Sequence, residues 1–441
     1  MMEVTKYADI ERLINDSEYA NTKHINITHI PTEREHELEE ELLAVKTDDL
    51  EWKNKVNSLK RQLADEKKNS SRYILKYDKF KINSENCHTL GLFRSIITDG
   101  ENILAFSPPK STNYEIFSKN NMDTELVFQE YVEGTMINLY YDKGDWELST
   151  RSNIGGRYAF YDTTCMTFRD MFLTAFTDMQ LEFDNFKEGY SYSFVVQHPE
   201  NRIVVPFNKP RLILTNVYKL NGTYVEEMDL NNAGSWCEPS AYDKLKFPRY
   251  LDKLIGLTEN NVELVYEKIV SGENIDYTMV GGVVSNRKNG TRVKIRNPTY
   301  EYVRQLRGNN AKLQFQYYYL RKHGKVKEFL NYFPEMGEEL DKYRKQLHVW
   351  TNNLHQNYTK CYIRKERELK TFPFEFRTHM FELHQEYLGS LIASGQYVSK
   401  NVVINYVNEL PPAYLMSSIN YPLKKYNIEK SKKMVEENLN V

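Results

Sequence analysis

The sequence predicts an α+β fold in three parts: a charged N-terminal helical segment over residues 1–72, a domain of antiparallel sheets over 73–298, and an all-helical C-terminal domain over 299–441. The middle domain is predicted from short β-rich runs separated by turn signals such as Asn289-Gly290. After residue 298 the strand signals fade and helical periods follow. A chain of 441 residues is long enough for two or three domains.

Within the N-terminal segment, residues 33–69 are rich in charge and place apolar side chains at the 4-3-4-3 spacing of a coiled coil. This pattern predicts dimerisation or docking on a partner helix. It also fits a single amphipathic helix lying on its own domain, because fewer than four heptads are present. The seam positions, of which all but the aspartate are apolar, are Leu38, Leu42, Val45, Asp49, Trp52, Val56, Leu59 and Leu63.

Helical periods are also predicted outside this segment. Two of them, residues 167–178 and 240–255, lie between the β-rich runs of the middle domain. Beyond residue 298, prolines separate helical segments that we expect at 300–322, 325–346, 347–369, 374–394 and 400–409.

Composition excludes several classes of protein. The four cysteines form no CxxC pair, which argues against a zinc site or a disulfide framework. The sequence shows no apolar run of membrane-spanning length and no N-terminal signal core, so we expect no membrane association and a cytoplasmic protein, in the host cytoplasm or the virion if it is viral. Residues 301–441 hold 22 Lys and Arg against 15 Asp and Glu, a net charge of +7 that would suit RNA.

Five segments of the middle domain follow one another in a recognisable order. They are "LFRSIITDGENILAFSPPKSTNYEIF", "EYVEGTMINLYY", "WELSTRSNIGG", "YSFVVQHPENRIVVPFNKPRLILTNVYKLNGTYVE" and "MVGGVVSNRKNGTRVKIRN". Their order resembles that of ATP-dependent RNA ligases of the T-even bacteriophage type, in a branch like that of large DNA viruses, within the covalent nucleotidyltransferase superfamily. The most specific match is "HPENRIVVP" at 198–206.

The resemblance implies an ATP-grasp-like ligase domain and a defined chemistry. In the family, the lysine of a K-x-D-G motif attacks the α-phosphate of ATP, AMP passes to an RNA 5′-phosphate, and a 3′-hydroxyl displaces it. A metal and several cations stabilise the charge that builds up on phosphorus. ATP and Mg²⁺ are therefore the expected cofactors of an active enzyme, and a degenerate one could need none.

Several functional positions match the family. Glu133 stands in the motif's aspartate position, and Arg296 replaces the second lysine of the last motif, keeping its charge but not its geometry. The resemblance implies a catalytic role for Lys294 and Arg296 and nucleotide contact for the remaining matches. The retained positions are Arg94, Lys110, Glu133, Gly134, Arg151, Gly281, Lys294 and Arg296.

Three positions depart from the family. Tyr131 occupies the place of the nucleophilic lysine, and Val195 (or Ser193, if the register slips) and Val280 occupy the places of two carboxylates. The sequence leaves three explanations open: a degenerate ligase that keeps the fold, a displaced lysine such as Lys76 or Lys79, or Tyr131 itself as nucleophile. We favour the first, because three groups of one catalytic machine are missing together.

RNA contact is predicted at two places. Arg292, Lys294 and Arg296 alternate along one strand and share a face that would point at phosphate. Further along, Arg304, Arg307 and Lys312 precede the aromatic stretch 315–319, a mixture that suits single-stranded RNA, although Tyr317–Tyr319 also fit a helix core.

Three functions therefore remain open. The sequence favours a degenerate RNA-ligase-like protein that binds RNA, tRNA in particular, or serves as a subunit of a complex. The alternatives are an active RNA ligase with a displaced nucleophile, used for example in tRNA repair, and a structural or assembly protein that forms homo- or hetero-oligomers through residues 33–69.

Overall fold

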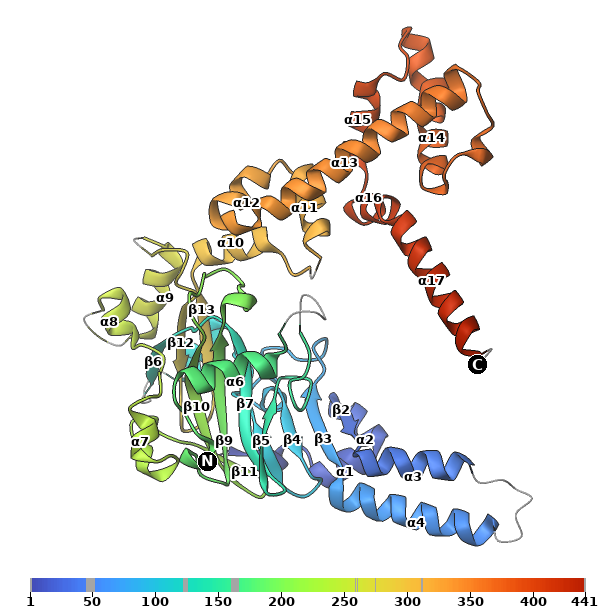
Figure 1. Ribbon diagram of the computed structural model, residues 1–441. Helices are drawn as coiled ribbons and strands as arrows, with labels where there is room; N and C mark the ends of the chain where they lie inside the picture. Colours follow the sequence, from blue (N-terminus) through green and yellow to red (C-terminus); the bar gives the residue numbers. More distant parts are fainter. Residues whose placement is uncertain are drawn as a thin grey trace. The chain divides into compact units, whose positions relative to one another are not determined.

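The computed structural model describes residues 2–44, 52–121, 126–159, 166–257, 259, 261–273, 275–310 and 312–439. The chain divides into two compact units, Met1–Tyr302 and Val303–Val441 (Figure 1). The first unit contains three antiparallel sheets with helices packed on them, and the described part of the second is helical. The protein therefore has the α+β fold that the sequence predicts.

The largest sheet has the strand order β1-β11-β10-β9-β7-β8 and is antiparallel throughout. Helix α6 (Phe168–Asp178), which begins with a capping box between Thr167 and Asp170, packs on its central strands (Figure 1). Phe172 and Phe194 belong to the apolar core of this region. The strands are β1 (Met2–Glu3), β7 (Thr135–Asp142), β8 (Asp145–Ser149), β9 (Tyr190–Gln197), β10 (Arg211–Asn221) and β11 (Tyr224–Glu227).

A smaller sheet consists of β13 (Arg292–Arg296), β12 (Gly281–Ser285) and β6 (Val127–Glu130). Its register sets Val283 opposite Lys294 and Gly282 opposite Glu130. The chain leaves β6 and enters β7 through residues 131–134, so this short loop passes from the smaller sheet to the largest one. Helices α5 (Tyr114–Asn120), α8 (Leu251–Ile255) and α9 (Val262–Ser271) pack on the smaller sheet.

The third sheet shows that the N-terminal segment is not a separate helical part. Strand β2 (Ile25–Ile30) pairs with β3 (Arg72–Tyr77), which is followed by β4 (Ile96–Thr98) and β5 (Ile103–Phe106), and β1 extends the largest sheet. Helices α1 (Ile10–Asn15) and α2 (Ser17–Thr22) add buried side chains to the core beside it. The boundary predicted after residue 72 therefore does not separate two units of the structure.

The stretch 33–69 contains two helices. Helix α3 (Glu33–Ala44) packs against α4 (Trp52–Ser70), and Leu38 and Leu59 are buried (Figure 1). The expectation of one continuous helix was wrong because the chain reverses between the two halves of the seam, and Val45 and Asp49 lie outside the described residues. At least part of the apolar seam is thus covered within the chain itself.

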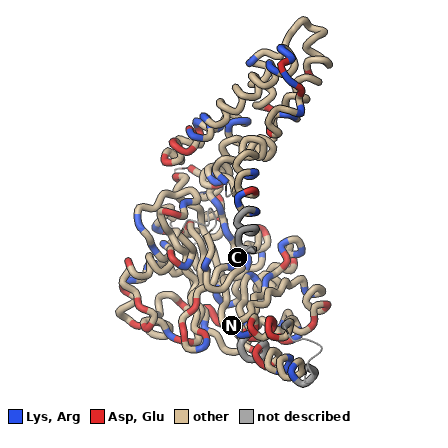
Figure 2. The backbone as a smooth tube through the Cα atoms, turned by 45° about the vertical axis from the view of Figure 1, so that its right-hand side comes forward, with Lys and Arg blue, Asp and Glu red and all other residues tan. Residues whose placement is uncertain are grey.

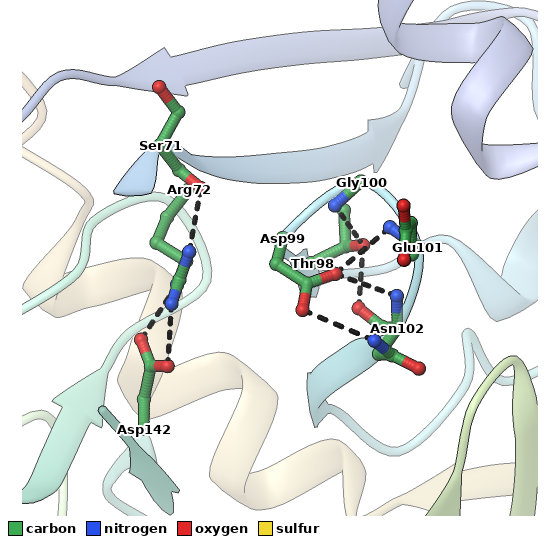
Figure 3. Close-up of polar contacts among 8 residues, drawn as sticks. All are labelled: Ser71, Arg72, Thr98, Asp99, Gly100, Glu101, Asn102 and Asp142. Carbon is green, nitrogen blue, oxygen red and sulfur yellow. Dashed lines mark hydrogen bonds and ion pairs between the residues drawn. The ribbon is translucent and has the colours of Figure 1, made fainter. Parts of the chain in front are cut away.

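Polar contacts tie this region to the largest sheet (Figure 3). The Arg72 guanidinium on β3 donates two hydrogen bonds to the Asp142 carboxylate at the end of β7, at 2.7 and 2.8 Å, and a third to the carbonyl of Ser71. In the turn from β4 to β5, the Asp99 carboxylate accepts the backbone N–H of Asn102 at 2.7 Å. The two-bond contact of Arg72 with Asp142 thus links strand β3 of the third sheet to strand β7 of the largest sheet.

Helix boundaries differ from the predictions at several points. The helix predicted at 240–255 is two short helices, α7 (Pro239–Tyr242) and α8, because Pro248 between them cannot donate a backbone hydrogen bond. The helices of the C-terminal part, the first of which spans the boundary between the units, are α10 (Pro298–Arg307), α11 (Leu313–Lys322), α12 (Val326–Tyr332), α13 (Gly337–Tyr358), α14 (Phe374–Glu386), α15 (Lys400–Glu409), α16 (Pro412–Ile419) and α17 (Tyr421–Leu439).

The aromatic stretch of α11 is divided between core and surface. Tyr317 and Tyr318 are buried, whereas Tyr319 is 43% exposed. The core interpretation therefore holds for the first two rings and not for the third. Within the described part of the chain, no helix combines the length and the apolar character that crossing a membrane would require.

Candidate functional site

The loop from β6 to β7 contains the first predicted motif, and glycines allow its backbone to pass close to its neighbours. Gly134 has φ +141°, and a Cβ there would lie 2.3 Å from the carbonyl oxygen of Val196. Gly281 has φ +140°, and a Cβ there would lie 2.0 Å from the carbonyl oxygen of Ile295. The backbone N–H of Tyr131 donates to the Gly281 carbonyl at 2.9 Å, so the two predicted glycine segments lie together.

Glu133 has a different role from the one that its motif position implies. Its buried carboxylate accepts the backbone N–H groups of Val204 and Val205 at 2.7 and 3.0 Å, and Gln197 donates to its carbonyl oxygen. Burial raises the pKa of the carboxyl, while the two N–H donors oppose that rise. Glu133 thus links the "HPENRIVVP" segment to the loop, and its carboxylate is engaged in hydrogen bonds with the backbone of that segment.

Tyr131, in the position of the missing lysine, has a lysine beside it. The Nζ of Lys294 donates to the Tyr131 hydroxyl at 3.0 Å and lies 4.1 Å from the centroid of the ring. Burial, together with the positive charges of neighbouring basic side chains, lowers the pKa of Lys294 to about 5. At neutral pH this amine is therefore uncharged.

Lys294 belongs to a group of six basic side chains, which we call the cationic cluster: Arg94, Lys110, Arg151, Arg292, Lys294 and Arg296. Their mutual proximity is visible in their electrostatics, since Arg292, Arg94, Arg296 and Lys110 all lower the pKa of Lys294, and Arg151 lowers that of Arg94. The members come from three of the five segments that the sequence singled out: the first, the third and the last. The fold thus brings together residues that lie up to about 200 positions apart.

Backbone carbonyls hold two arginines of the cluster. Arg94 donates to the carbonyl of Pro108 at 3.2 Å, and Arg292 donates to the carbonyls of Pro109 and Pro108 at 2.7 and 3.2 Å. Burial lowers the pKa of Arg94 to about 10 and lowers that of Arg292. Arg292 is only 7% exposed, so its side chain does not stand on an open strand surface; that it contacts RNA stays a prediction.

The charge of the cluster is poorly balanced. Among the described residues, Arg296 is the one member of the cluster with an ion pair, which it forms with Glu301 at 3.3 Å. Arg151 stacks on the ring of Tyr77, 5.0 Å from its centroid, and its buried Nε has no hydrogen-bond partner. Near Arg292, the carboxylate of Glu227 accepts the Asn216 side-chain amide at 2.7 Å, and burial raises its pKa.

Two hollows adjoin Tyr131. A small cavity of about 60 Å³ is lined by Lys294, Arg292, Val195 and Glu227, and by Tyr218, whose buried hydroxyl lacks a hydrogen-bond partner. A larger cleft of about 1040 Å³ is lined by Val280, Gln197 and several basic side chains. Those basic side chains are Lys209, Arg211, Lys244, Lys246 and Arg249. Tyr131 lines both hollows and thus lies between the small cavity and the basic cleft.

The residues present do not fit the divalent metal that the family resemblance implies. Val195 and Val280, buried at the positions of two carboxylates, offer only hydrocarbon. Glu130 is engaged with Arg249 at 2.7 Å, and Glu133 with backbone N–H groups. Within the described ranges, no group of three His, Cys, Asp or Glu side chains could hold a metal ion.

Not every predicted residue joins this site. Arg304, Arg307 and Lys312 belong to the second unit, and Arg307 is buried, which does not suit an exposed RNA contact. Lys76, one of the two lysines considered as replacement nucleophiles, lies near Arg151. Burial lowers the pKa of Lys76, and the positive charge of Arg151 adds to this effect. Sequence reasoning missed Tyr77, Tyr218 and Glu227, because none of them stands at a motif position and only the packing of the sheets brings them here.

Comparisons with known proteins give a partial likeness. No family model matches the chain. An RNA ligase of Rhodothermus phage RM378 is 32% identical over 96 residues, which is 20% of this chain and 22% of that protein. The chain thus spans about a fifth of the length of the curated relative that it matches. This match supports similarity to an RNA ligase over that stretch.

Solved structures add little to this. A Naegleria gruberi RNA ligase mutant with ATP and Mn is 11% identical, with a TM-score of 0.31 over 44% of this chain and 57% of that one. An archaeal ATP-dependent RNA ligase is 10% identical, with a TM-score of 0.31 over 80% of this chain and 68% of that one. Scores this low establish neither a shared fold nor a shared activity, so the likeness to RNA ligases rests on sequence.

Proposed function

We propose that this chain is an RNA-ligase-like protein that holds the phosphates of a nucleotide or of an RNA end, tRNA included, in the cationic cluster and has lost adenylate transfer. The main support is the environment of Tyr131. Its hydroxyl is hydrogen-bonded to Lys294 where the nucleophilic lysine is expected, and valines stand at the two carboxylate positions.

The physical argument concerns what the chemistry needs. Transfer of AMP through lysine requires an unprotonated amine at the phosphorus and groups that stabilise charge in the transition state. A phenol with an ordinary pKa near 10 is a weak nucleophile at neutral pH. Valine at 195 and at 280 cannot ligate a metal or accept a proton. The basic side chains suited to phosphate remain, so the protein can keep phosphate binding after it has lost catalysis.

The test is incubation of the purified protein with α-labelled ATP or GTP and Mg²⁺ or Mn²⁺, followed by denaturing electrophoresis. We expect no labelled protein, together with retention of a 5′-phosphorylated RNA in a filter-binding assay. A covalent adduct that survives denaturation would overturn the loss of transfer. Failure to retain any phosphorylated ligand would overturn the binding role.

Restoring the lysine sharpens this test. The variant Tyr131→Lys is expected to remain unlabelled, since both carboxylate positions are still valine. The triple variant with Val195→Glu and Val280→Glu returns all three groups, and labelling of the triple alone would support their joint loss as the cause. Labelling of the single variant would show that the remaining site is competent.

One observation favours a second candidate, an active ligase in which Lys294 is the nucleophile. Its amine lies 3.0 Å from the hydroxyl that replaces the expected amine, and its pKa of about 5 leaves it unprotonated. In this reaction Nζ attacks the α-phosphorus of ATP, a P–N bond forms, the bond to the bridging oxygen breaks, pyrophosphate leaves, and the amine proton passes to solvent. Mass spectrometry that maps AMP to Lys294, and loss of the adduct in Lys294→Arg, would establish it.

A further inference from the structure

We infer that the cationic cluster binds a polyphosphate without a divalent cation, the ligand being a nucleoside triphosphate or the triphosphorylated 5′ end of an RNA. This inference rests on the proposed phosphate-binding function and adds the ligand class and the way in which its charge is neutralised. It departs from what the resemblance to RNA ligases implies, in which a metal shares that task.

The first argument is the excess of positive charge. Six basic side chains lie in one cluster, and the ion pair of Arg296 with Glu301 is the one that the described residues provide for them. Buried arginines of like charge repel one another strongly in a medium of low dielectric constant. A ligand with several negative charges, placed at the cluster, would relieve that repulsion. A single phosphate would neutralise only part of it.

The second argument is a set of unsatisfied donors. The Nε of Arg151 is buried without a hydrogen-bond partner beside Arg94, and the Tyr218 hydroxyl is buried without one in the wall of the small cavity. Buried polar groups in folded proteins are nearly always paired, so two orphans at one cluster indicate a missing acceptor. Phosphate oxygens are acceptors that a guanidinium and a hydroxyl can both reach.

The third argument is the lack of carboxylates to hold a metal, described above for Val195, Val280, Glu130 and Glu133. Glu227 is the remaining acid of the small cavity, and it accepts a hydrogen bond from Asn216. A hard divalent cation needs several oxygen ligands from protein, phosphate or water. The protein can supply neutralising charge here far more readily than it can supply such ligands.

Proton uptake provides a signature of this arrangement. In the empty site Lys294 is uncharged at neutral pH, because it is buried and faces Arg292 and Arg296 on its own strand, and Arg94, Lys110 and Tyr131 from other elements. A bound phosphate would favour the charged ammonium, so binding takes up a proton. Affinity should therefore weaken as pH rises above neutrality, by up to about tenfold per unit.

The experiment is calorimetric titration of the full chain with tripolyphosphate, ATP, or a short RNA that ends in a 5′-triphosphate, each in EDTA and in excess Mg²⁺. The expected affinity in EDTA is equal to or higher than that in Mg²⁺, with proton uptake measured in two buffers of different ionisation enthalpy. Comparison of ATP with the RNA distinguishes the two sources of polyphosphate. An affinity about tenfold lower in EDTA, or no uptake of protons, would overturn the inference.

Two variants and a control complete the test. Arg151→Gln should weaken binding about tenfold or more, as expected for one charged hydrogen bond, and Lys294→Met should abolish the proton uptake while leaving the protein folded. The control is Lys219→Gln, at an exposed position of β10 outside the cationic cluster. It should change neither the affinity nor the proton uptake. If no phosphate ligand binds in either solution, the proposed function itself fails; if binding occurs only with Mg²⁺, the metal-free inference alone fails.

Discussion

Basic residues are used differently in the two units of the chain. In the second unit Arg321 donates to Asn408, Lys322 pairs with Glu409, and Lys345 pairs with Asp341. Figure 2 shows Lys and Arg interspersed with Asp and Glu along those helices. In the first unit Arg94 and Arg151 have no carboxylate partner among the described residues, although residues 73–300 carry 25 Lys and Arg against 30 Asp and Glu.

The difference teaches that net charge of a segment is a poor guide to an anion site. Segment 301–441, which is net positive, has several of its cations beside acids and amides. Segment 73–300, which is net negative, contains Arg94 and Arg151 without a carboxylate partner among the described residues. Surface pairs on a helix contribute little energy and leave little field outside. An unpaired, half-buried group of cations creates a strong local potential whatever the sum of charges elsewhere.

The largest expected effect is a loss of phosphate affinity when the two arginines without a carboxylate partner are replaced together, and this variant tests the comparison most directly. The double variant Arg94→Gln and Arg151→Gln should lose about 100-fold or more in affinity for tripolyphosphate, since each charged hydrogen bond is worth about 1.5–3 kcal/mol. The matched pair Lys322→Gln and Lys345→Gln should change it less than about twofold. Calorimetry measures both, with circular dichroism to verify folding, and equal losses would show that the cluster has no special role.

A smaller effect is expected from the backbone that positions the cluster. Gly134→Ala should destabilise the first unit by about 1–3 kcal/mol, because φ is +141° and the new Cβ would meet the Val196 carbonyl. Gly144→Ala is the matched control: its φ of +87° is also strained for alanine, but nothing lies within 4 Å of its Cβ. Urea unfolding should place Gly134→Ala well below Gly144→Ala; equal midpoints would contradict the close approach.

The smallest effect concerns the stability that the protein loses by burying Lys294. Unfolded lysine binds a proton below pH 10.5 and folded Lys294 only below about 5, so stability from this group rises with pH between those values. Lys294→Met should therefore raise the melting temperature of the empty protein by a few degrees at neutral pH, at roughly 2–4 °C per kcal/mol. The gain should shrink as pH approaches 10. A melting temperature that falls would show that the amine stabilises the fold.

The sequence was enough to predict the strands and glycines of the site, but not most of the side chains that line its cavity. Gly134 and Gly281 were found because backbone demands on glycine show in local sequence. Tyr218 and Glu227 were not, because they lie opposite each other in the largest sheet, and only the folding of the whole unit brings them to the cavity that Lys294 of β13 also lines. The same limit explains the hairpin of α3 and α4, since a heptad pattern does not reveal that the chain reverses and covers its own seam.

The tie between Glu133 and the backbone of Val204 and Val205 has a consequence for recognising such proteins. The most family-like phrase of the sequence, "HPENRIVVP", contains both residues that this carboxylate holds. Hydrogen bonds of this kind stabilise the loop whatever reaction the protein supports. A sequence match to this segment can therefore reflect the framework of the fold and not the chemistry performed on it.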